Sequence, residues 1–250
     1  MLKRCPLSVP LFVFLAVSCG ISAAESPISS LDTTTQQTDL LSAINKAEEL
    51  TVRDKAFPKK TAKWESTNFS GSRSTAIYVC WENPQPKNSQ ERLWVQEAAV
   101  GSWDRLSALS FRGWERCRPN TRGIRIRVED SGPHTKGLGK YLDGITDGMV
   151  LNFEFNNWGQ PCKDMREDCI KSIAVHEFGH AIGFAHEQNR PDTPGECRKL
   201  AQGSDGDTTD LTPWDPNSVM NYCNKKYNND GVLSDFDKKA VRYIYGPPNG

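Results

Sequence analysis

Three of the four histidines in this 250-residue chain lie within eleven positions, in the run HEFGHAIGFAH that begins at His176. Positions i and i+4 share one face of a helix, so His176 and His180 can direct two imidazoles at one metal ion. Glu177 stands beside them, where its carboxylate can take a proton from metal-bound water. Gly183 lets the backbone turn out of the helix, so that His186 can return as a third ligand. Three protein ligands leave one coordination position open, as in catalytic rather than structural zinc sites.

The alternative is a helix that carries surface histidines by chance. With residue frequencies of a few per cent, the five fixed positions coincide with a probability on the order of 10⁻⁸ per start site. A bare His-Glu-x-x-His pattern is only moderately specific. The extended pattern is much more specific, so a catalytic zinc site is the better interpretation.

The helix that carries these histidines is expected over residues 167–183. Its apolar residues recur at helical spacing and form one packing stripe, made of Ile170, Ala174, Phe178 and Ala181. A second helix is expected over residues 90–107, with four apolar residues on related faces: Leu93, Val100, Trp103 and Leu106. A last helix is expected to begin at Ser234, where Asp237 completes a capping pattern, and to end at Gly246-Pro247.

Strands are expected where apolar and polar residues alternate, over residues 75–81, 108–114, 123–129 and 149–156, with a short edge strand near residues 140–142. The order of these elements predicts an α/β (α+β) domain. It should have a mixed, twisted sheet with an edge strand over a cleft and two long helices behind the sheet. A loop-rich C-terminal subdomain should follow the histidine helix and end in the last helix.

The charge of the chain is balanced, with 31 Lys and Arg residues against 31 Asp and Glu residues. A net charge of zero argues against nucleic acid or an anionic membrane as the main partner. Six arginines are concentrated in one region: Arg112, Arg116, Arg118, Arg122, Arg125 and Arg127. Apolar residues alternate with Arg125 and Arg127, so we interpret this region as a strand with a solvated charged face. Recruitment of an acidic substrate is the second interpretation.

The first residues are typical of an export signal. Lys3 and Arg4 precede an apolar stretch over residues 7–17 that is too short to span a bilayer, and Ser22-Ala23-Ala24 offers small residues for cleavage. Lipid attachment at Cys19 is the alternative. The residue three positions before that cysteine is alanine rather than a bulkier aliphatic residue, so we favour plain cleavage.

These features predict a signal peptide over residues 1–24, a linker or pro-segment over residues 25–63, and a folded domain with the zinc motif over residues 64–250. The middle segment is polar, with one helix expected near residues 39–52, and both interpretations of it stay open. The protein is expected to be secreted or periplasmic, with no transmembrane segment. Its oligomeric state is not predicted.

Removal of such a signal peptide leaves six cysteines: Cys80, Cys117, Cys162, Cys169, Cys197 and Cys223. An even number in an exported chain indicates three disulfides, for which fifteen pairings exist. A cysteine metal site is disfavoured because the chain has no Cys-x-x-Cys pair. Our hypothesis joins these cysteines in chain order, so that the bridge between Cys162 and Cys169 clamps the entry to the histidine helix.

The extended histidine pattern resembles the signature of the metzincin zinc endopeptidases, and Ser218-Val219-Met220-Asn221-Tyr222 resembles their Met-turn, a methionine-containing turn beneath the metal. Within this clan the chain is most similar to the astacins. Residues 187–192, Glu-Gln-Asn-Arg-Pro-Asp, follow His186, and a tyrosine stands two residues after Met220. Residues 193–197 depart from the usual astacin pattern, and the order of elements also suits the matrixins.

The resemblance implies a role for each residue of the zinc motif. His176, His180 and His186 would bind one zinc ion, which would activate a water molecule and polarise the scissile carbonyl. Glu177 would be the general base that accepts the proton of this water and passes it to the leaving amine. Met220 would form an apolar floor under the ion.

Three further residues would support the site. Tyr222 would match the astacin tyrosine that can bind zinc and stabilise the transition state; an ordinary core tyrosine is the alternative. Glu187 would match the glutamate that pairs with the mature N-terminus inside the protein; a local surface salt bridge is the alternative. Gly183 would provide the turn that returns the third histidine.

The resemblance therefore implies a secreted zinc metalloendopeptidase acting on a protein or peptide, which would lie along the edge strand near residues 140–142. The alternative is a catalytically idle or anchored surface protein that binds a partner in the same cleft. The intact Glu177 argues against an idle protein.

Other polar and aromatic residues say less about the function of the protein. His134 is expected to be a loop residue, because the set of three histidines is already complete. Calcium is not supported, because three nearby aspartates lack the spacing of a known calcium loop: Asp205, Asp207 and Asp210. Trp158 and Trp214 could line the cleft, although core packing is the favoured interpretation.

Overall fold

The computed structural model describes residues 58–69, 72–158, 160–202 and 211–248. All of them belong to one compact unit, from Glu49 to Gly250. The predictions for the signal peptide, the Cys19 anchor, the helix near residues 39–52 and the aspartates at 205–210 lie outside the described residues. Among the described helices, none is both long and apolar enough to cross a membrane.

Six strands form a mixed sheet in the described part of the chain. They are β1 (Thr67–Phe69), β2 (Ser72–Trp81), β3 (Leu109–Arg116), β4 (Ile124–Val128), β5 (His134–Thr135) and β6 (Met149–Leu151). Their order is β1-β2-β4-β6-β5, and β3 also pairs with β2. β2 runs parallel to β3 and β4, and β4 runs parallel to β6. β1 and β5 are antiparallel to their neighbours, which confirms the predicted mixed sheet.

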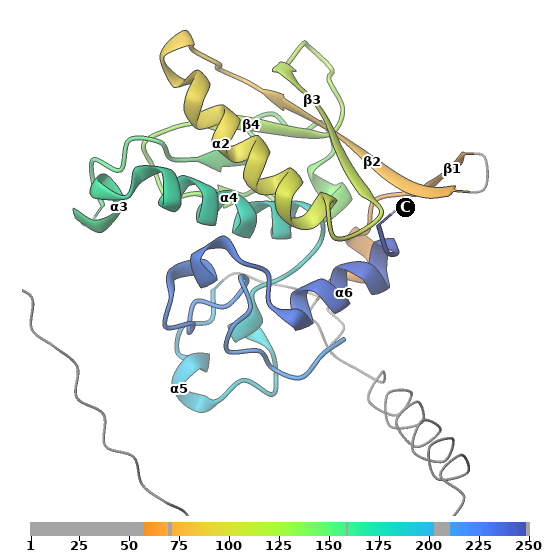
Figure 1. The fold of residues 1–250 in the computed structure, drawn as a ribbon, viewed down its shortest axis with the longest axis vertical. Coiled ribbons are helices and arrows are strands. Elements are labelled where there is room, and N and C mark those ends of the chain that lie inside the picture. Colours follow the sequence, from red (N-terminus) through yellow and green to blue (C-terminus); the bar gives the residue numbers. More distant parts are fainter. Residues whose placement is uncertain (1–57, 70–71, 159, 203–210, 249–250) are drawn as a thin grey trace, which may run out of the picture. The chain divides into compact units, whose positions relative to one another are not determined.

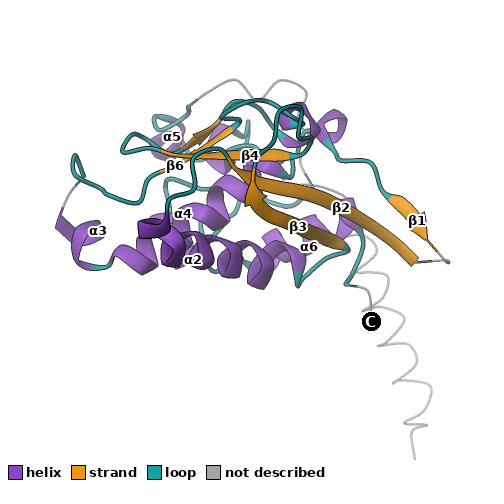
Figure 2. Cartoon of the chain, turned by 90° about the horizontal axis from the view of Figure 1, so that it is seen from above, coloured by secondary structure: helices purple, strands orange, loops and turns teal. Residues whose placement is uncertain are grey.

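The described α-helices are α2 (Ser89–Ala99), α3 (Gln160–Asp164), α4 (Arg166–Ala181), α5 (Gly195–Arg198) and α6 (Asp235–Tyr245). A π-helical turn, Val100–Asp104, continues α2. The two long helices α2 and α4 lie on one face of the sheet (Figure 2), and the segment with α5 and α6 lies beyond α4 (Figure 1). The predicted packing stripe of α4 is buried in the core: Ile170, Ala174, Phe178 and Ala181.

The face of α2 that meets the core differs from the prediction at one residue. Leu93 is 45% exposed, whereas Val95, Ala99 and Trp103 are fully buried. Successive residues of a helix are about 100° apart, so Leu93 points about 200° away from Val95. The indole nitrogen of Trp103 donates a hydrogen bond to the carbonyl oxygen of Val175 at 2.8 Å, which ties α2 to α4.

The edge strand is β5, not the segment near residues 140–142 as predicted. Residues Gly139–Leu142 form a 3-10 helix instead. Gly139 has a φ of +53°, and a Cβ atom there would overlap the carbonyl oxygen of Ala62. This close approach requires glycine at position 139, and Leu142 in the same 3-10 helix is completely buried. His134, which was expected to be a loop residue, lies in the edge strand β5.

The strand expected over residues 149–156 is shorter than predicted, because a turn ends it after Leu151. The side-chain oxygen of Asn152 accepts hydrogen bonds from the backbone of Glu154 and Phe155, at 2.8 and 2.9 Å. Phe155 has a φ of +56°, outside the range of a strand. Phe153 and Phe155 are nevertheless buried.

The charged face predicted for β4 is only partly solvated. Arg125 is buried and forms an ion pair with Glu82, with 2.7 Å between Nε and Oε1. It also donates to the carbonyl oxygens of Arg118 and Thr121, so the loop after β3 covers it. Arg127 remains partly exposed.

Three disulfides join the cysteines in chain order, which confirms the predicted pairing: Cys80–Cys117, Cys162–Cys169 and Cys197–Cys223. The first bridge links the ends of the parallel strands β2 and β3. The second links α3 to the first turns of α4, the helix that carries His176 and His180. The third links α5 to the residue after Tyr222.

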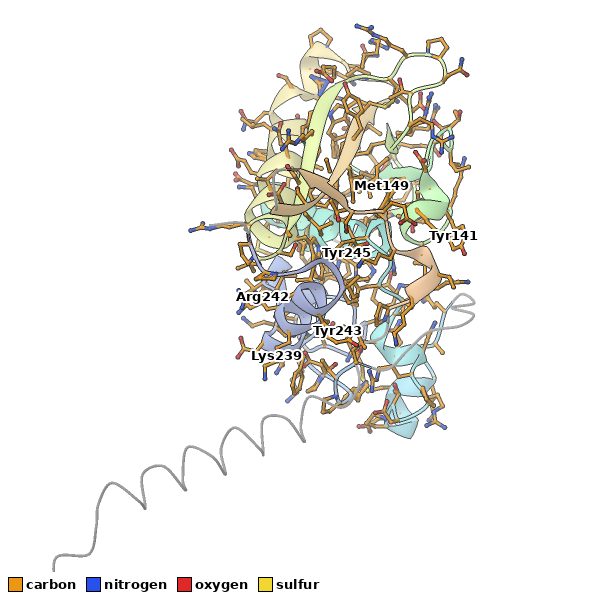
Figure 3. All side chains as sticks on the ribbon, turned by 90° about the vertical axis from the view of Figure 1, so that its right-hand side faces the viewer. Tyr141, Met149, Lys239, Arg242, Tyr243 and Tyr245 are labelled. Carbon is orange, nitrogen blue, oxygen red and sulfur yellow. A yellow bond between two sulfur atoms is a disulfide. The ribbon has the colours of Figure 1, made fainter. Side chains whose placement is uncertain are left out.

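The last helix, α6, begins with the predicted cap. Ser234 accepts a hydrogen bond from the backbone of Asp237, and the Asp237 side chain accepts one from the backbone of Ser234. Figure 3 shows Tyr245 directed inward, with other α6 side chains on the outside: Lys239, Arg242 and Tyr243. The buried hydroxyl of Tyr245 donates to the carbonyl oxygen of Ile182 at 2.7 Å, just past the end of α4.

Candidate metal centre

The end of α4 is shaped by a glycine. Gly183 has a φ of +103°, a conformation that L side chains rarely adopt. The backbone of Phe184 then donates to the carbonyl oxygen of Gly179 at 2.9 Å, which closes the helix. The Lys59 backbone donates to the carbonyl oxygen of Gly183, also at 2.9 Å. The chain thus leaves the helix after His180 and brings His186 back towards it.

The imidazoles of His176, His180 and His186 converge. Each offers one ring nitrogen, and these nitrogens all lie within 4.8 Å of one another. The Nε2 atoms of His180 and His186 are 3.1 Å apart. Among the residues the structure describes, no other group of three His, Cys, Asp or Glu side chains is placed to hold a metal ion.

Backbone carbonyls orient the three rings. The Nδ1 atom of His176 lies 2.7 Å from the backbone oxygen of Val219. The Nδ1 atom of His180 lies 2.8 Å from the backbone oxygen of Phe184, and that of His186 lies 3.3 Å from the backbone oxygen of Gln202. A carbonyl only accepts hydrogen bonds, so each Nδ1 carries a proton, and in a neutral ring Nε2 then keeps its lone pair. Such contacts are typical of histidines that bind metals.

The electrostatics of the rings fit a cation. Burial, and then the neighbouring His186, lower the pKa of His176 to about 3. Burial lowers the pKa of His180 well below its usual range. Both rings are therefore neutral at neutral pH, as metal binding requires. The buried Nε2 atom of His176 has no hydrogen-bond partner among the described residues. Three imidazoles that converge in this way suit zinc.

Glu177 is buried next to this cluster. Its Oε2 atom is also without a hydrogen-bond partner in the described structure. Burial raises the pKa of Glu177 to about 8. A cation held by the histidines would favour the ionised carboxylate and lower this value. The group can therefore exchange a proton near neutral pH.

Tyr222 and Met220 flank the cluster from the Met-turn. The Tyr222 ring stacks on His176, with 5.1 Å between centroids, and lies 4.7 Å from the His186 ring. Burial, and then the charge of Glu177, raise the pKa of Tyr222, so its hydroxyl keeps its proton and can donate it to a hydrogen bond. Met220 is buried against α4 at Gly179.

Glu187 is buried and does not form the surface salt bridge considered as an alternative. One carboxylate oxygen accepts a hydrogen bond from the Asp215 backbone at 2.9 Å, and the same oxygen lies 3.3 Å from Nε of the fully buried Arg190. Burial raises the pKa of Glu187 to about 8. The expected pairing with a mature N-terminus involves residues outside those described.

One residue of the site was recognised in the sequence only as a helix cap. Asp237 accepts hydrogen bonds from the Ser218 hydroxyl at 2.7 Å and the Val219 backbone at 3.0 Å. The carbonyl of Val219 in turn orients His176. The capping pattern of Ser234 predicted the helix, but no sequence signal indicated that its aspartate also holds the Met-turn.

The two tryptophans considered for the cleft are partly buried. Trp158 packs against the rings of Phe155 and Tyr227, with 5.3 and 6.2 Å between centroids. It lines a recess at the start of α4, together with part of the Cys162–Cys169 disulfide. Trp214 precedes the Met-turn.

Part of the chain is similar to a known protein family. Residues 160–243 match the family model of the astacin peptidases. The zinc metalloproteinase nas-30 of Caenorhabditis elegans is 25% identical over 92% of this chain and 33% of its own length. The zinc metalloproteinase nas-36 of Haemonchus contortus is 34% identical, over 30% of this chain and 14% of that protein.

The fold is also shared with a solved structure. The structure of myroilysin matches with a TM-score of 0.54 and 20% sequence identity, over 78% of this chain and 100% of that one. The predicted α/β fold class is confirmed. The chain spans about a third of the length of the first curated relatives it matches. The resemblance to the metzincin zinc metalloendopeptidases is thus confirmed, and the astacin family is matched over the residues that carry the histidines and the Met-turn.

Proposed function

We propose that this protein is an exported, zinc-dependent endopeptidase that hydrolyses peptide bonds in proteins or peptides. One observation carries this proposal. The Nε2 atoms of three histidines converge beside Glu177, a buried carboxylate with an oxygen that lacks a hydrogen-bond partner in the described structure. The match to zinc metalloproteinases supports the same activity.

In this proposal His176, His180 and His186 hold the zinc ion. When bound, zinc supplies a water of lowered pKa and a Lewis acid for the scissile carbonyl. Glu177 takes the proton of the attacking water and delivers it to the leaving amine. Tyr222 donates a hydrogen bond to the oxygen that becomes negative in the transition state.

The surroundings of the site hold these groups in place. Met220 supports the histidines from below, and Gly183 returns the chain to His186. Glu187 anchors the segment after the third histidine through Arg190 and the Asp215 backbone. We also propose that Glu187 can pair with the mature N-terminus, since its buried carboxylate already lies close to the Met-turn.

An extended substrate is proposed to pair with β5, the last strand in the described sheet order. An edge strand offers unpaired backbone groups on its outer side, to which a peptide can add as a further strand. This location replaces the segment near residues 140–142, which is not a strand.

Export is supported by the three disulfides, since such bridges persist in oxidising compartments. We propose a secreted or periplasmic location, with a signal peptide over residues 1–24 and a linker or pro-segment over residues 25–63. Part of that segment already packs on the folded unit: Ala62 is buried, and Pro58 pairs with Phe184.

The test is hydrolysis of casein and of a peptide library by the purified full chain, with its zinc content measured by elemental analysis. About one zinc per chain and hydrolysis that a chelator abolishes are expected. The Glu177→Ala variant should keep the zinc and lose hydrolysis. A folded wild-type protein without zinc, or hydrolysis that survives in His180→Ala, would refute the proposal.

A further inference from the structure

The edge strand β5 has one residue whose backbone groups are directed away from the sheet. β5 is antiparallel to β6, with Thr135 opposite Met149. The next residue, Lys136, donates its backbone N–H to the carbonyl oxygen of Gly148 at 2.8 Å. Hydrogen-bonded and non-hydrogen-bonded pairs alternate along an antiparallel ladder, so the N–H and C=O groups of Thr135 point to the open side of β5. A peptide that adds to this edge therefore forms its backbone hydrogen bonds with Thr135.

The side chains around Thr135 alternate between the two faces of the sheet. Met149 belongs to the hydrophobic core, and residues opposite each other in a ladder share one face. Thr135 is therefore on the face covered by α2 and α4 (Figure 2). His134 and Lys136 project from the other, outer face, because successive side chains of a strand point to opposite faces. Both of these residues are exposed.

The basic side chains of this outer face differ in how their charges are balanced. Arg127 lies two strands away, opposite the β6 residue that pairs with His134. It is paired with two carboxylates, Glu129 at 2.9 Å and Asp147 at 3.8 Å. Lys136 forms no ion pair with any residue that the structure describes, and its ammonium group donates to a backbone carbonyl at 3.0 Å. Its positive charge is therefore available to a ligand.

A strand added antiparallel to β5 places one of its side chains against Lys136. The substrate residue opposite Thr135 faces the helices, and the residues before and after it face outward, one opposite Lys136 and the other opposite His134. Opposite residues of neighbouring strands have Cβ atoms about 4.5–5.5 Å apart, so a glutamate or aspartate there reaches the ammonium group. Opposite charges at such positions are favourable, and a substrate lysine or arginine would be repelled.

We propose that Lys136 is a specificity-determining residue, which selects an acidic side chain at the substrate position opposite it. The proposal rests on the endopeptidase function and on the pairing with β5 proposed above. Alternation confines the selection to one position, because the adjacent substrate residue beside Thr135 points to the other face. The substrates are therefore extended segments with a glutamate or aspartate at a fixed distance from the cleaved bond.

The test compares the neutral variant Lys136→Gln and the charge reversal Lys136→Glu with wild type. Lys239→Glu is the matched control, because Lys239 is an exposed lysine on the outside of α6 (Figure 3). All are assayed as the zinc-loaded full chain on a peptide library that varies each position on both sides of the cleaved bond.

Wild type should favour glutamate over lysine at one substrate position, with kcat/KM values that differ roughly fivefold, as suits one exposed pair across two strands. In Lys136→Gln this preference should disappear, and in Lys136→Glu it should reverse. Lys239→Glu should keep the wild-type preference. Preferences at the two adjacent substrate positions should stay the same in all four proteins.

A further variant tests the pairing with β5 itself. Thr135→Pro removes the N–H that points to the open side and leaves the hydrogen bonds between β5 and β6 in place, since proline is tolerated at such positions of edge strands. It should lower kcat/KM for every peptide, whereas its zinc content should equal that of wild type.

The outcomes separate the proposals. Hydrolysis without a preference for glutamate over lysine at any position would overturn selection by Lys136 while the peptidase function stands. A preference that both Lys136 variants retain, or that Lys239→Glu changes to the same extent, would do so too. Undiminished hydrolysis by a folded Thr135→Pro would overturn the pairing with β5 and, with it, the role of Lys136. No hydrolysis of any peptide by the zinc-loaded wild type would overturn the endopeptidase function as well.

Discussion

The sulfur atom of Met220 occupies the place where a Cβ atom on residue 179 would stand, between the two α4 histidines. The methionine methyl group and a ring carbon of Trp103 lie 3.1 and 3.2 Å from the same point. The glycine in the middle of the His-Glu-Phe-Gly-His run is therefore required by the Met-turn packed below it.

Gly179→Ala is expected to destabilise the protein by about 1–3 kcal/mol, because the added methyl group must displace Met220 or the helix. Displacement would also disturb the imidazoles and weaken zinc binding. Gly101→Ala is the matched control, since a Cβ atom there meets nothing within 4 Å. Denaturant unfolding and zinc titration measure both effects, and equal stability of the two variants would contradict the packing argument.

Glu177→Ala is expected to lower kcat by roughly 10²–10⁴-fold without loss of zinc, because in the proposed mechanism the carboxylate transfers a proton while the three imidazoles bind the metal. His176→Ala should instead lose the zinc itself. Activity and metal content measured on the same samples distinguish these roles. A Glu177→Ala protein with near-normal turnover would show that another group is the base.

Chelation should lower the Tm of wild type, because a metal that binds only the folded state stabilises it by mass action. The Tm of His180→Ala should not respond to the chelator, since this variant lacks one ligand. Thermal unfolding with and without the chelator measures both. An equal decrease in Tm in the two proteins would show that the metal binds at another site.

Asp237 is expected to make the free energy of unfolding depend on pH. Burial raises its pKa from 3.8 to about 6 in the folded protein. The folded state thus binds this proton more tightly than the unfolded state. The contribution of the protonated Asp237 to the free energy of unfolding is therefore complete below pH 4 and is lost as the pH rises through 6. The advantage of wild type over Asp237→Asn should therefore shrink between pH 4 and pH 6.

Urea unfolding of the chelator-treated proteins at several pH values measures this difference. Only the difference between the two proteins is informative, because His176 and Glu187 also titrate abnormally. An advantage of wild type that grows over this pH range would mean that the hydrogen bonds to the ionised Asp237 outweigh its burial.

Much of the site was predictable because its geometry is local. The spacing of His176 and His180 puts both on one face of any helix, and Gly183 marks where the helix ends. The cap at Ser234 and the alternation in β2 and β4 depend likewise on a few adjacent residues. Predictions based on such short-range geometry agree with the structure.

Contacts between distant segments were not predictable in the same way. Arg125 is buried by a loop, and Gly139 lies against the Ala62 backbone in a 3-10 helix where the edge strand was expected. Helical periodicity could not decide which face of α2 meets Val175 and therefore misplaced Leu93.

The sequence by itself determined the residues of the candidate metal centre: three histidines at the spacing of metal ligands, the adjacent carboxylate and the helix that presents them. The tertiary structure decided how these groups are held. Met220 packs against Gly179, the Val219 backbone N–H donates a hydrogen bond to Asp237, and the Val219 carbonyl accepts one from His176. The reason is physical. Local patterns specify the conformation of one segment, whereas packing and the burial of polar groups depend on which segments meet.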